Sequence, residues 1–244
     1  MRVIGHFAST QYWSIDRNIC QNISAHLQFS SMVNRHAIKD LLEPFKIPIC
    51  DDSIDKLIVY LDLLIRWNQK INLTAVRSPQ ECVTRHFGES LLLSRINPLK
   101  GSLLDIGSGA GFPGLAIKVI APELEVFLLE PIGKKRAFLK EVARSCGFHK
   151  VNVLETRLEE YSQSQSKASF DIITVRAVGG LVPLFPATQA LLKSGGSLCL
   201  WVGRQQGQLI QEANSTLTWN EPLPIPLSND RQILSGTNIR PRSS

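Results

Sequence analysis

Short apolar runs alternate with stretches of helical periodicity over most of the chain. Five of these runs are bounded by Gly, Pro or polar residues and predict buried strands, at residues 102–106, 124–130, 150–155, 170–175 and 197–202. Apolar positions at helical spacing lie between them, as in residues 134–143 and 183–193. Strands that alternate with helices predict an α/β fold with a mostly parallel sheet flanked by helices.

A helical segment precedes the first predicted strand. Residues 33–45 predict a short helix, and residues 54–65 place apolar side chains on one face of a longer one. Ser78, Pro79 and Glu81 then form a typical helix start, with a capping serine, a proline at the first position and an acid in the first turn. We therefore expect a helical segment at residues 32–97 and an α/β domain at residues 98–244.

The two ends of the chain carry weaker patterns. Residues 1–31 are rich in Ser, Gln, Asn and His, show no sustained period and predict a poorly structured extension. Regular patterning begins just after Met32, so translation from Met32 and a genuine flexible extension are both open. Toward the C-terminus we expect residues 194–196 to end a helix, residues 208–216 to be helical, and residues 221–227 and 231–234 to add edge strands.

Three glycines spaced two residues apart follow the first predicted strand, at Gly107, Gly109 and Gly111. Pro113 then begins the next predicted helix. A strand, a glycine turn and a helix bring backbone N–H groups and a helix N-terminus against a ligand. Glycine permits both the close approach and the positive φ of such a turn. We interpret this stretch as the cradle of a cofactor.

Two acids near the glycine turn narrow the class of cofactor. Glu130 ends the second predicted strand, where a carboxylate suits the paired hydroxyls of an adenosine ribose. This layout fits S-adenosylmethionine and the nicotinamide dinucleotides, and the stretch from Gly109 to Gly114 matches G-x-G-x-x-G. In dinucleotide folds the first glycine directly follows the strand, a place that Gly107 holds here. Asp105 can accept hydrogen bonds from the loop or lie near a cationic amino-acid ligand, and a pyrophosphate would gain nothing from it. The pattern favours S-adenosylmethionine.

Other polar residues occur before and after this turn. Arg85, His86, Glu89 and Ser90 lie within two turns of one predicted helix, and no G-x-S-x-G elbow occurs, so a Ser-His-acid hydrolase is a poor interpretation. Together they can form a polar patch that faces the glycine loop. Arg176 ends the fourth predicted strand, where a buried arginine is costly unless it is paired. Ligands bind at that edge of open α/β sheets, so Arg176 is a candidate functional residue.

Composition agrees with the predicted globular fold and adds few constraints on function. The 244 residues are 43% hydrophobic and 20% charged, as in ordinary globular domains, and the net charge of +6 suits an anionic partner. Five widely spaced cysteines without a C-x-x-C pair indicate buried reduced thiols rather than disulfides or metal ligands, so we expect no metal. The chain has no apolar run long enough to span a membrane, and its N-terminus lacks the apolar core of a signal peptide. We therefore expect a cytoplasmic protein without a membrane partner.

Four motifs occur in the order of one known family. They are Trp67-Asn68-x-x-x-Asn72-Leu73-Thr74, Arg85-His86-x-x-Glu89-Ser90, the stretch from Asp105 to Gly114, and Arg176-Ala177. Over about residues 38–234 the chain resembles the RsmG (GidB) family of bacterial 16S rRNA guanine-N7 methyltransferases. The resemblance implies a Rossmann-like class I S-adenosylmethionine-dependent methyltransferase fold behind an N-terminal helical cap. It also implies S-adenosylmethionine as the cofactor and 16S rRNA or the small ribosomal subunit as the partner.

The resemblance also assigns individual positions. Beside Asp105, Gly109 and Gly111 of the loop, the family's cofactor positions fall on Gly107, Phe112, Glu130, Leu158, Glu159 and Arg176. Three residues depart from the family pattern outside this loop. Glu89 stands where Asp is usual, Val175 where Ser is frequent, and Val202 where Lys is common. The last change removes a cation on the RNA side, which Arg204 can replace.

Methylation of guanine N7 needs no general base, because N7 carries a free lone pair. We expect catalysis to rest on proximity and orientation, with Arg176 as the catalytic residue that positions cofactor and base. The residues expected to contact RNA phosphates are Arg85, Lys134, Lys135, Arg136 and Arg204. The major groove of A-form RNA is too narrow for protein side chains, so the target guanine should lie in a loop or be splayed out. An NAD(P)-dependent oxidoreductase and a catalytically silent RNA-binding protein on the same fold are the alternatives.

Overall fold

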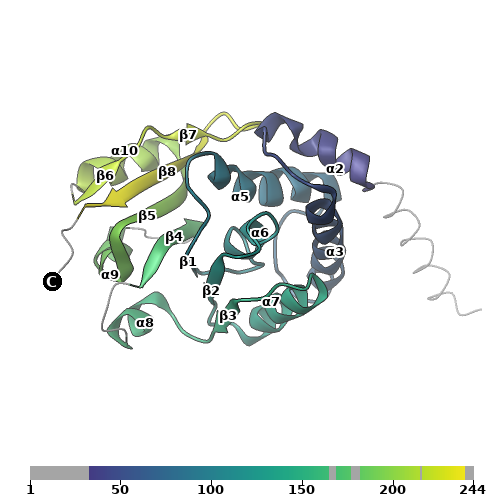
Figure 1. The fold of residues 1–244 in the computed structure, drawn as a ribbon, viewed down its shortest axis with the longest axis horizontal. Coiled ribbons are helices and arrows are strands. Elements are labelled where there is room, and N and C mark those ends of the chain that lie inside the picture. The colour runs from purple at the N-terminus through teal and green to yellow at the C-terminus, as the bar shows by residue number, and fades with distance from the viewer. Residues whose placement is uncertain (1–32, 165–168, 177–181, 215, 240–244) are drawn as a thin grey trace, which may run out of the picture.

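The structure, a computed structural model, describes residues 33–164, 169–176, 182–214 and 216–239. The predicted extension at 1–31 and the hypothesis about Met32 lie outside the described residues. Figure 1 shows a central twisted sheet with helices packed on both of its faces, which confirms the expected α/β fold.

The sheet has eight strands in the order β3-β2-β1-β4-β5-β8-β6, and β7 pairs with β8. The strands are β1 (Ser102–Ile106), β2 (Glu125–Leu129), β3 (Val151–Leu154), β4 (Phe170–Arg176), β5 (Leu192–Gly203), β6 (Leu217–Trp219), β7 (Leu223–Pro224) and β8 (Arg231–Asn238). The first five are parallel, and β8 is antiparallel to β5, β6 and β7. Ile106 of β1 pairs with Leu129 of β2 and with Val175 of β4. The residues that follow these strands therefore meet at one edge of the sheet, as expected for a ligand site.

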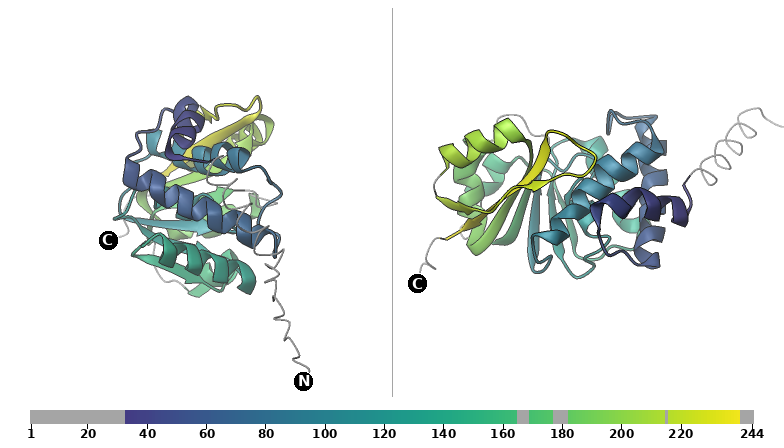
Figure 2. Two further views of the ribbon diagram at one scale, coloured as in Figure 1. Left: turned by 90° about the vertical axis from the view of Figure 1, so that its right-hand side faces the viewer. Right: turned by 90° about the horizontal axis from the view of Figure 1, so that it is seen from above.

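Helices cover the two faces of the sheet unequally. One face carries the N-terminal helices together with α6 and α7: α2 (Arg35–Leu42), η1 (Glu43–Phe45), α3 (Asp51–Asn68), α4 (Pro79–Cys82), η2 (Val83–Gly88), α5 (Glu89–Leu91), η3 (Leu92–Arg95), α6 (Gly114–Ile117) and α7 (Gly133–Ser145). The other face carries α8 (Leu158–Ser164), α9 (Phe185–Leu191) and α10 (Arg204–Ala213), with η4 (Val182–Leu184) before α9. Figure 2 shows α2 and α3 at the opposite end of the molecule from α10, while the start of β8 reaches α5.

The N-terminal helices share one core with the sheet. Leu57, Leu61 and Leu64 of α3 belong to the same buried cluster as Leu103 of β1 and Phe138 of α7. Buried apolar area is the main source of folding free energy, and the helices of the segment at 33–97 pack both against one another and against the α/β domain in this cluster. We infer that this segment folds as one unit with the sheet.

Local sequence signals explain where the helices begin. The Asn34 side chain accepts a hydrogen bond from the Ala37 amide at the start of α2, and Ser78 does the same for the Glu81 amide at the start of α4. The helix predicted after Ser78 is not uniform, because its middle, η2, is π-helical. Single π-helical turns are rare and frequently occur at functional sites.

Several predictions for the C-terminal half are corrected. β8 is not an edge strand, since it lies between β5 and β6, and β6 had no predicted counterpart. Residues 194–196 belong to β5, where Gly195 has a φ of 78° and the register to β4 shifts. The helix expected at 208–216 spans Arg204–Ala213. The helix expected after Pro113 is the short α6, Gly114–Ile117.

Two expectations from composition concern the thiols and membrane spans. Cys82, Cys146 and Cys199 are buried free thiols as predicted, whereas Cys50 is exposed. Among the described residues, none of the helices combines the length and apolar character that crossing a membrane requires.

Candidate active site

The glycine loop connects β1 to α6 at the carboxyl edge of the sheet. Gly107, Gly109 and Gly111 have φ values of 67°, 57° and 87°. This left-handed region is costly for residues with a Cβ, which explains the spacing of the three glycines. The Ser108 amide donates to the Leu129 carbonyl over 3.0 Å, so the start of the loop is tied to the end of β2.

Asp105 supports the loop from beneath. Its side chain is fully buried, and its Oδ2 accepts from the Gly114 amide at 3.2 Å while its Oδ1 accepts from the Thr174 hydroxyl at 2.7 Å. A Cβ on Gly114 would lie 2.6 Å from the Cβ of Asp105, so only glycine allows this approach. Burial raises the pKa of Asp105 to about 6, against the opposing effect of its hydrogen bonds. The first of the two roles predicted for Asp105, accepting hydrogen bonds from the loop, is confirmed.

Glu130 lies beside the open surface of the loop. Its carboxylate is buried and accepts from the Gly109 amide at 2.9 Å through Oε2 and from the Ile132 amide at 2.8 Å through Oε1. A Cβ on Gly109 would approach no atom of the described residues more closely than the Gly107 carbonyl oxygen, at 3.8 Å. Each carboxylate oxygen keeps a lone pair for a further donor. An open glycine surface beside a fixed carboxylate fits the adenosyl part of S-adenosylmethionine, whose ribose has two hydroxyl donors.

Phe112 is held between two aromatic rings from the helical segment. The Tyr60 ring is stacked on it with centroids 5.4 Å apart, and the His86 ring is stacked at 4.7 Å. The Phe112 side chain is 8% exposed, so most of its surface is already in contact with protein. The polar patch that we expected around His86 therefore does reach the cofactor loop, through this aromatic contact.

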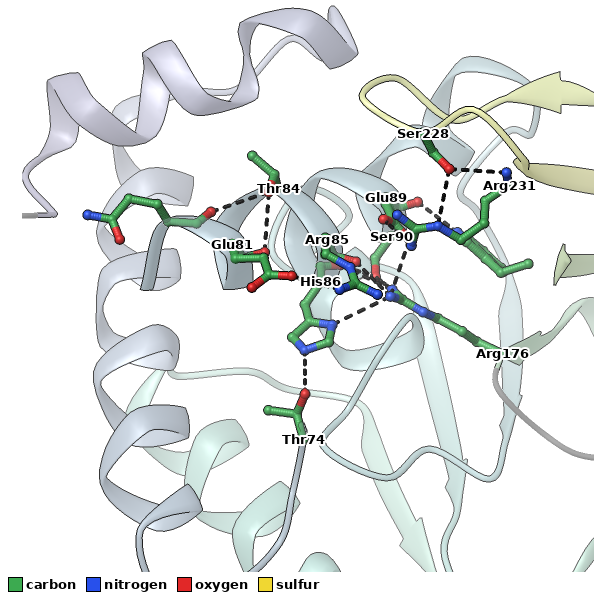
Figure 3. A network of polar contacts seen from close by, with 12 residues as sticks. Thr74, Glu81, Thr84, Arg85, His86, Glu89, Ser90, Arg176, Ser228 and Arg231 are labelled. Carbon is green, nitrogen blue, oxygen red and sulfur yellow. Dashed lines mark hydrogen bonds and ion pairs between the residues drawn. The ribbon is translucent and has the colours of Figure 1, made fainter. Parts of the chain in front are cut away.

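Arg176 joins the end of β4 to the π-helical turn (Figure 3). Its guanidinium donates to the Arg85 carbonyl at 2.6 Å and lies 3.4 Å from the Ser90 hydroxyl. It also lies 3.3 Å from one carboxylate oxygen of Glu89. Burial lowers the pKa of Arg176, and the nearby Glu89 charge opposes that effect. The expected pairing of a buried arginine at this edge is thus present.

The carboxylate of Glu89 also binds a second arginine, Arg231 at the start of β8 (Figure 3). The distance from its Oε1 to the Arg231 guanidinium is 2.5 Å, and the Glu89 side chain is only 3% exposed. Arg231 was not among the predicted site residues, because its strand was predicted to lie at the edge of the sheet. The sequence did contain one signal for this contact. Glu89 stands where the family usually has Asp, and its longer side chain reaches both arginines.

His86 is a neutral hydrogen-bonding residue at this junction. An arginine can only donate, so the contact of 3.4 Å from Arg176 makes Nδ1 the acceptor, and Nε2–H then donates to the Thr74 hydroxyl at 2.7 Å. Burial, with the neighbouring Arg176, Arg85 and Arg231, lowers the pKa of His86 to about 3. The imidazole therefore carries no charge at neutral pH.

The remaining predicted positions lie in different surroundings. Leu158 is buried in the core on the α8 face, whereas Glu159 beside it is exposed. Arg136 is engaged within the protein, since it donates to the carbonyls of Glu130 and Pro131 and forms an ion pair with Glu155. The exposed cations are Lys134, Arg204 and Arg85, the last paired with Glu81 at 2.7 Å, and Lys135 is half-buried. Val175 and Val202, two of the departures from the family pattern, are buried in the sheet.

Known proteins of similar sequence distinguish a methyltransferase from the alternatives. Residues 53–233 match the model of the family described as rRNA small subunit methyltransferase G. The chain belongs to this family. A ribosomal RNA small subunit methyltransferase G from Desulfitobacterium hafniense is 37% identical over 174 residues, covering 70% of this chain and 72% of the relative. One from Halorhodospira halophila is 38% identical over 178 residues, covering 73% and 81%.

Solved structures agree on the fold. A methyltransferase from Aquifex aeolicus described as dependent on S-adenosylmethionine has a TM-score of 0.51 at 13% identity, covering 64% of this chain and 92% of its own. A predicted O-methyltransferase from Agrobacterium tumefaciens has a TM-score of 0.50 at 21% identity, covering 61% and 79%. The resemblance to the RsmG (GidB) family is confirmed, and with it a Rossmann-like methyltransferase that uses S-adenosylmethionine. These findings do not favour an oxidoreductase or a silent RNA-binding protein.

Proposed function

We propose that this methyltransferase modifies N7 of a guanine in 16S rRNA, presented as free RNA or within the small ribosomal subunit of the cytoplasm. One observation carries the proposal. The open surface at Gly109 beside the Glu130 carboxylate meets, at the same sheet edge, the arginine that ends β4. A nucleoside cofactor at the glycine loop and a nucleotide substrate at the arginine would then lie next to each other.

The cofactor is held by the loop and by the ends of neighbouring strands in this proposal. Asp105 supports the loop, the backbone of Gly107, Gly109 and Gly111 lines it, and Glu130 accepts from the ribose hydroxyls. Phe112, Leu158, Glu159 and Arg176 complete the set, with Leu158 acting through its backbone because its side chain is buried. When bound, S-adenosylmethionine supplies an electrophilic methyl group.

The residues around Arg176 orient the reactants and do not move protons. Guanine N7 has a free lone pair, so no residue has to remove a proton before transfer. His86 suits this role because it is neutral and both of its ring nitrogens have partners. Arg176, fixed by Arg85 and Glu89, is the positioning group at the rim of the site. Orientation of this kind can supply about 7–11 kcal/mol of the barrier reduction.

RNA is bound through cations beside the site, three of them exposed and one, Lys135, half-buried. Lys134 and Lys135 lie in the first turn of α7, Arg204 begins α10, and Arg85 lies on the π-helical turn. Arg136 is not included, since its guanidinium is occupied by Glu130, Pro131 and Glu155. Phosphate contacts of this kind make affinity fall steeply with salt.

Methyl transfer in vitro tests the proposal. Purified protein is incubated with labelled S-adenosylmethionine and either naked 16S rRNA or small subunits from cells that lack the gene, and digested RNA is analysed by mass spectrometry. The proposal predicts label in N7-methylguanosine with at least one of these substrates. Label in a different nucleoside would contradict it, and so would a melting temperature that NAD raises and S-adenosylhomocysteine does not.

A further inference from the structure

Tyr60 of α3 contacts the cofactor loop from the helical segment. The ring is completely buried, and its hydroxyl donates to the Ala110 carbonyl at 2.5 Å. Ala110 lies between two of the loop glycines, Gly109 and Gly111. We propose that Tyr60 is a positioning residue that holds this loop in the shape that binds S-adenosylmethionine. This inference rests on the cofactor role proposed above for the loop.

The hydroxyl fixes one peptide plane at the apex of the loop. Peptide bonds are planar, so holding the Ala110 carbonyl also fixes the direction of the Gly111 N–H. That N–H donates to the Ser108 carbonyl at 2.7 Å and closes the turn. Loss of the Tyr60 hydroxyl would leave a carbonyl in this buried region without its donor, which is costlier than the hydrogen bond itself.

The ring of Tyr60 supports the same loop by packing. It is stacked on Phe112 with an interplanar angle of 8° and meets Phe87 edge-on at 5.0 Å. It also explains why position 111 is glycine, because a Cβ there would lie 2.2 Å from the Tyr60 hydroxyl oxygen. The loop and the tyrosine are therefore complementary in shape as well as in hydrogen bonding.

The residues around Tyr60 separate the role of its hydroxyl from the role of its ring. The ring is surrounded by Phe87, Phe112 and Phe138, and phenylalanine would fill the same space. The hydroxyl is thus needed for the Ala110 carbonyl rather than for packing. Burial raises the pKa of Tyr60, so the group stays protonated and remains a donor at every pH used for assays.

Tyr60→Phe in the full chain tests this inference. Calorimetry with S-adenosylhomocysteine should show about tenfold weaker binding, the size expected when a buried hydrogen bond near the ligand is lost. The KM for S-adenosylmethionine should rise by a similar factor, while kcat and the affinity for RNA change less than twofold. Tyr161→Phe is the matched control, because that ring contacts Phe170 on the α8 face and should leave binding unchanged. Unaltered binding in Tyr60→Phe, even with a lower melting temperature, would overturn the proposal.

Hydrogen exchange on the wild-type protein gives an independent readout. The amides of residues 109–112 should exchange slowly before any cofactor is added, because Tyr60 already orders the loop. Exchange at the rate of an unstructured peptide would contradict the inference. If S-adenosylhomocysteine binds but N7 is not methylated, the proposed function fails while the role of Tyr60 can still be tested. If it does not bind the wild-type protein, both proposals fail.

Discussion

The guanidinium of Arg176 and the carboxylate of Glu89 lie 3.3 Å apart and join the end of β4 to the N-terminal helical segment. Both side chains are largely buried, at 13% and 3% exposure. The same carboxylate binds Arg231 from β8, so one acid ties together three parts of the chain. A residue expected to act at the rim of the site is therefore also part of the framework.

Removal of this arginine should affect both stability and transfer. Arg176→Ala leaves a buried carboxylate with one partner in place of two, so we expect the free energy of unfolding to fall by about 3 kcal/mol. Methyl transfer, measured at a temperature where the variant is folded, should fall at least about 100-fold through loss of orientation. Arg144→Ala removes an exposed partner of Glu141 and serves as the control that changes neither quantity. Normal methylation by Arg176→Ala would exclude the positioning role.

The buried acid under the loop should make stability depend on pH. Folding raises the pKa of Asp105 from an ordinary 3.8 to about 6, so the folded state holds this proton more tightly than the unfolded state. Its stabilising contribution is complete below about pH 4 and is lost as the pH rises through 6, a loss of about 3 kcal/mol. Asp105→Asn removes this contribution. Urea unfolding should therefore show the variant gaining stability relative to wild type between pH 4 and pH 7, and parallel curves would contradict the prediction.

Alanine substitutions at Gly111 and Gly195 separate the effect of backbone strain from the effect of steric crowding. Gly111 and Gly195 both have positive φ, at 87° and 78°, but a Cβ on Gly111 would meet Tyr60 and Leu115 whereas a Cβ on Gly195 would meet nothing within 4 Å. Alanine at either position costs about 1–2 kcal/mol for the left-handed backbone. Gly111→Ala should lose more stability than Gly195→Ala and should also lose the rise in melting temperature caused by S-adenosylhomocysteine. Equal behaviour of the two variants would show that the loop tolerates displacement.

Two neighbouring cations at the start of α7 should differ in their effects. Lys134 is exposed, so Lys134→Ala should weaken RNA binding and reduce the slope of log affinity against log salt by about 0.7–0.9 if one phosphate contact is lost. Arg136→Ala should instead lower the melting temperature, because Arg136 holds the chain after β2 through the Glu130 and Pro131 carbonyls. Filter binding at several salt concentrations, with thermal melts of both variants, checks this. A reduced salt slope with an unchanged melting temperature in Arg136→Ala would instead place Arg136 in the RNA interface.

The structural features predicted correctly from the sequence are those that depend on residues close together in the chain. The strand before Gly107, the positive φ of the glycines and the placement of Glu130 follow from local patterns, and each prediction agrees with the structure. The same holds for Ser78 as a helix cap. These features depend on backbone conformation over a few residues, which the residue types themselves restrict.

Features that depend on distant pairing could not be predicted. The position of β8 inside the sheet is decided by its pairing with β5, and the short run at 231–234 gives no sign of that partner. Arg231 and Glu89 meet only because of this topology. The aromatic contacts of Tyr60 and His86 with Phe112 likewise join segments whose helical periodicity indicates burial but not the identity of the neighbour.

Mapping of N7-methylguanosine in 16S rRNA from cells with and without this gene shows whether the protein methylates guanine N7. Borohydride and aniline cleave RNA at N7-methylguanosine, and primer extension then locates each site. We expect one cleavage site that is absent without the gene, returns with the wild-type gene and does not return with Arg176→Ala. Identical cleavage patterns in the two strains would contradict it.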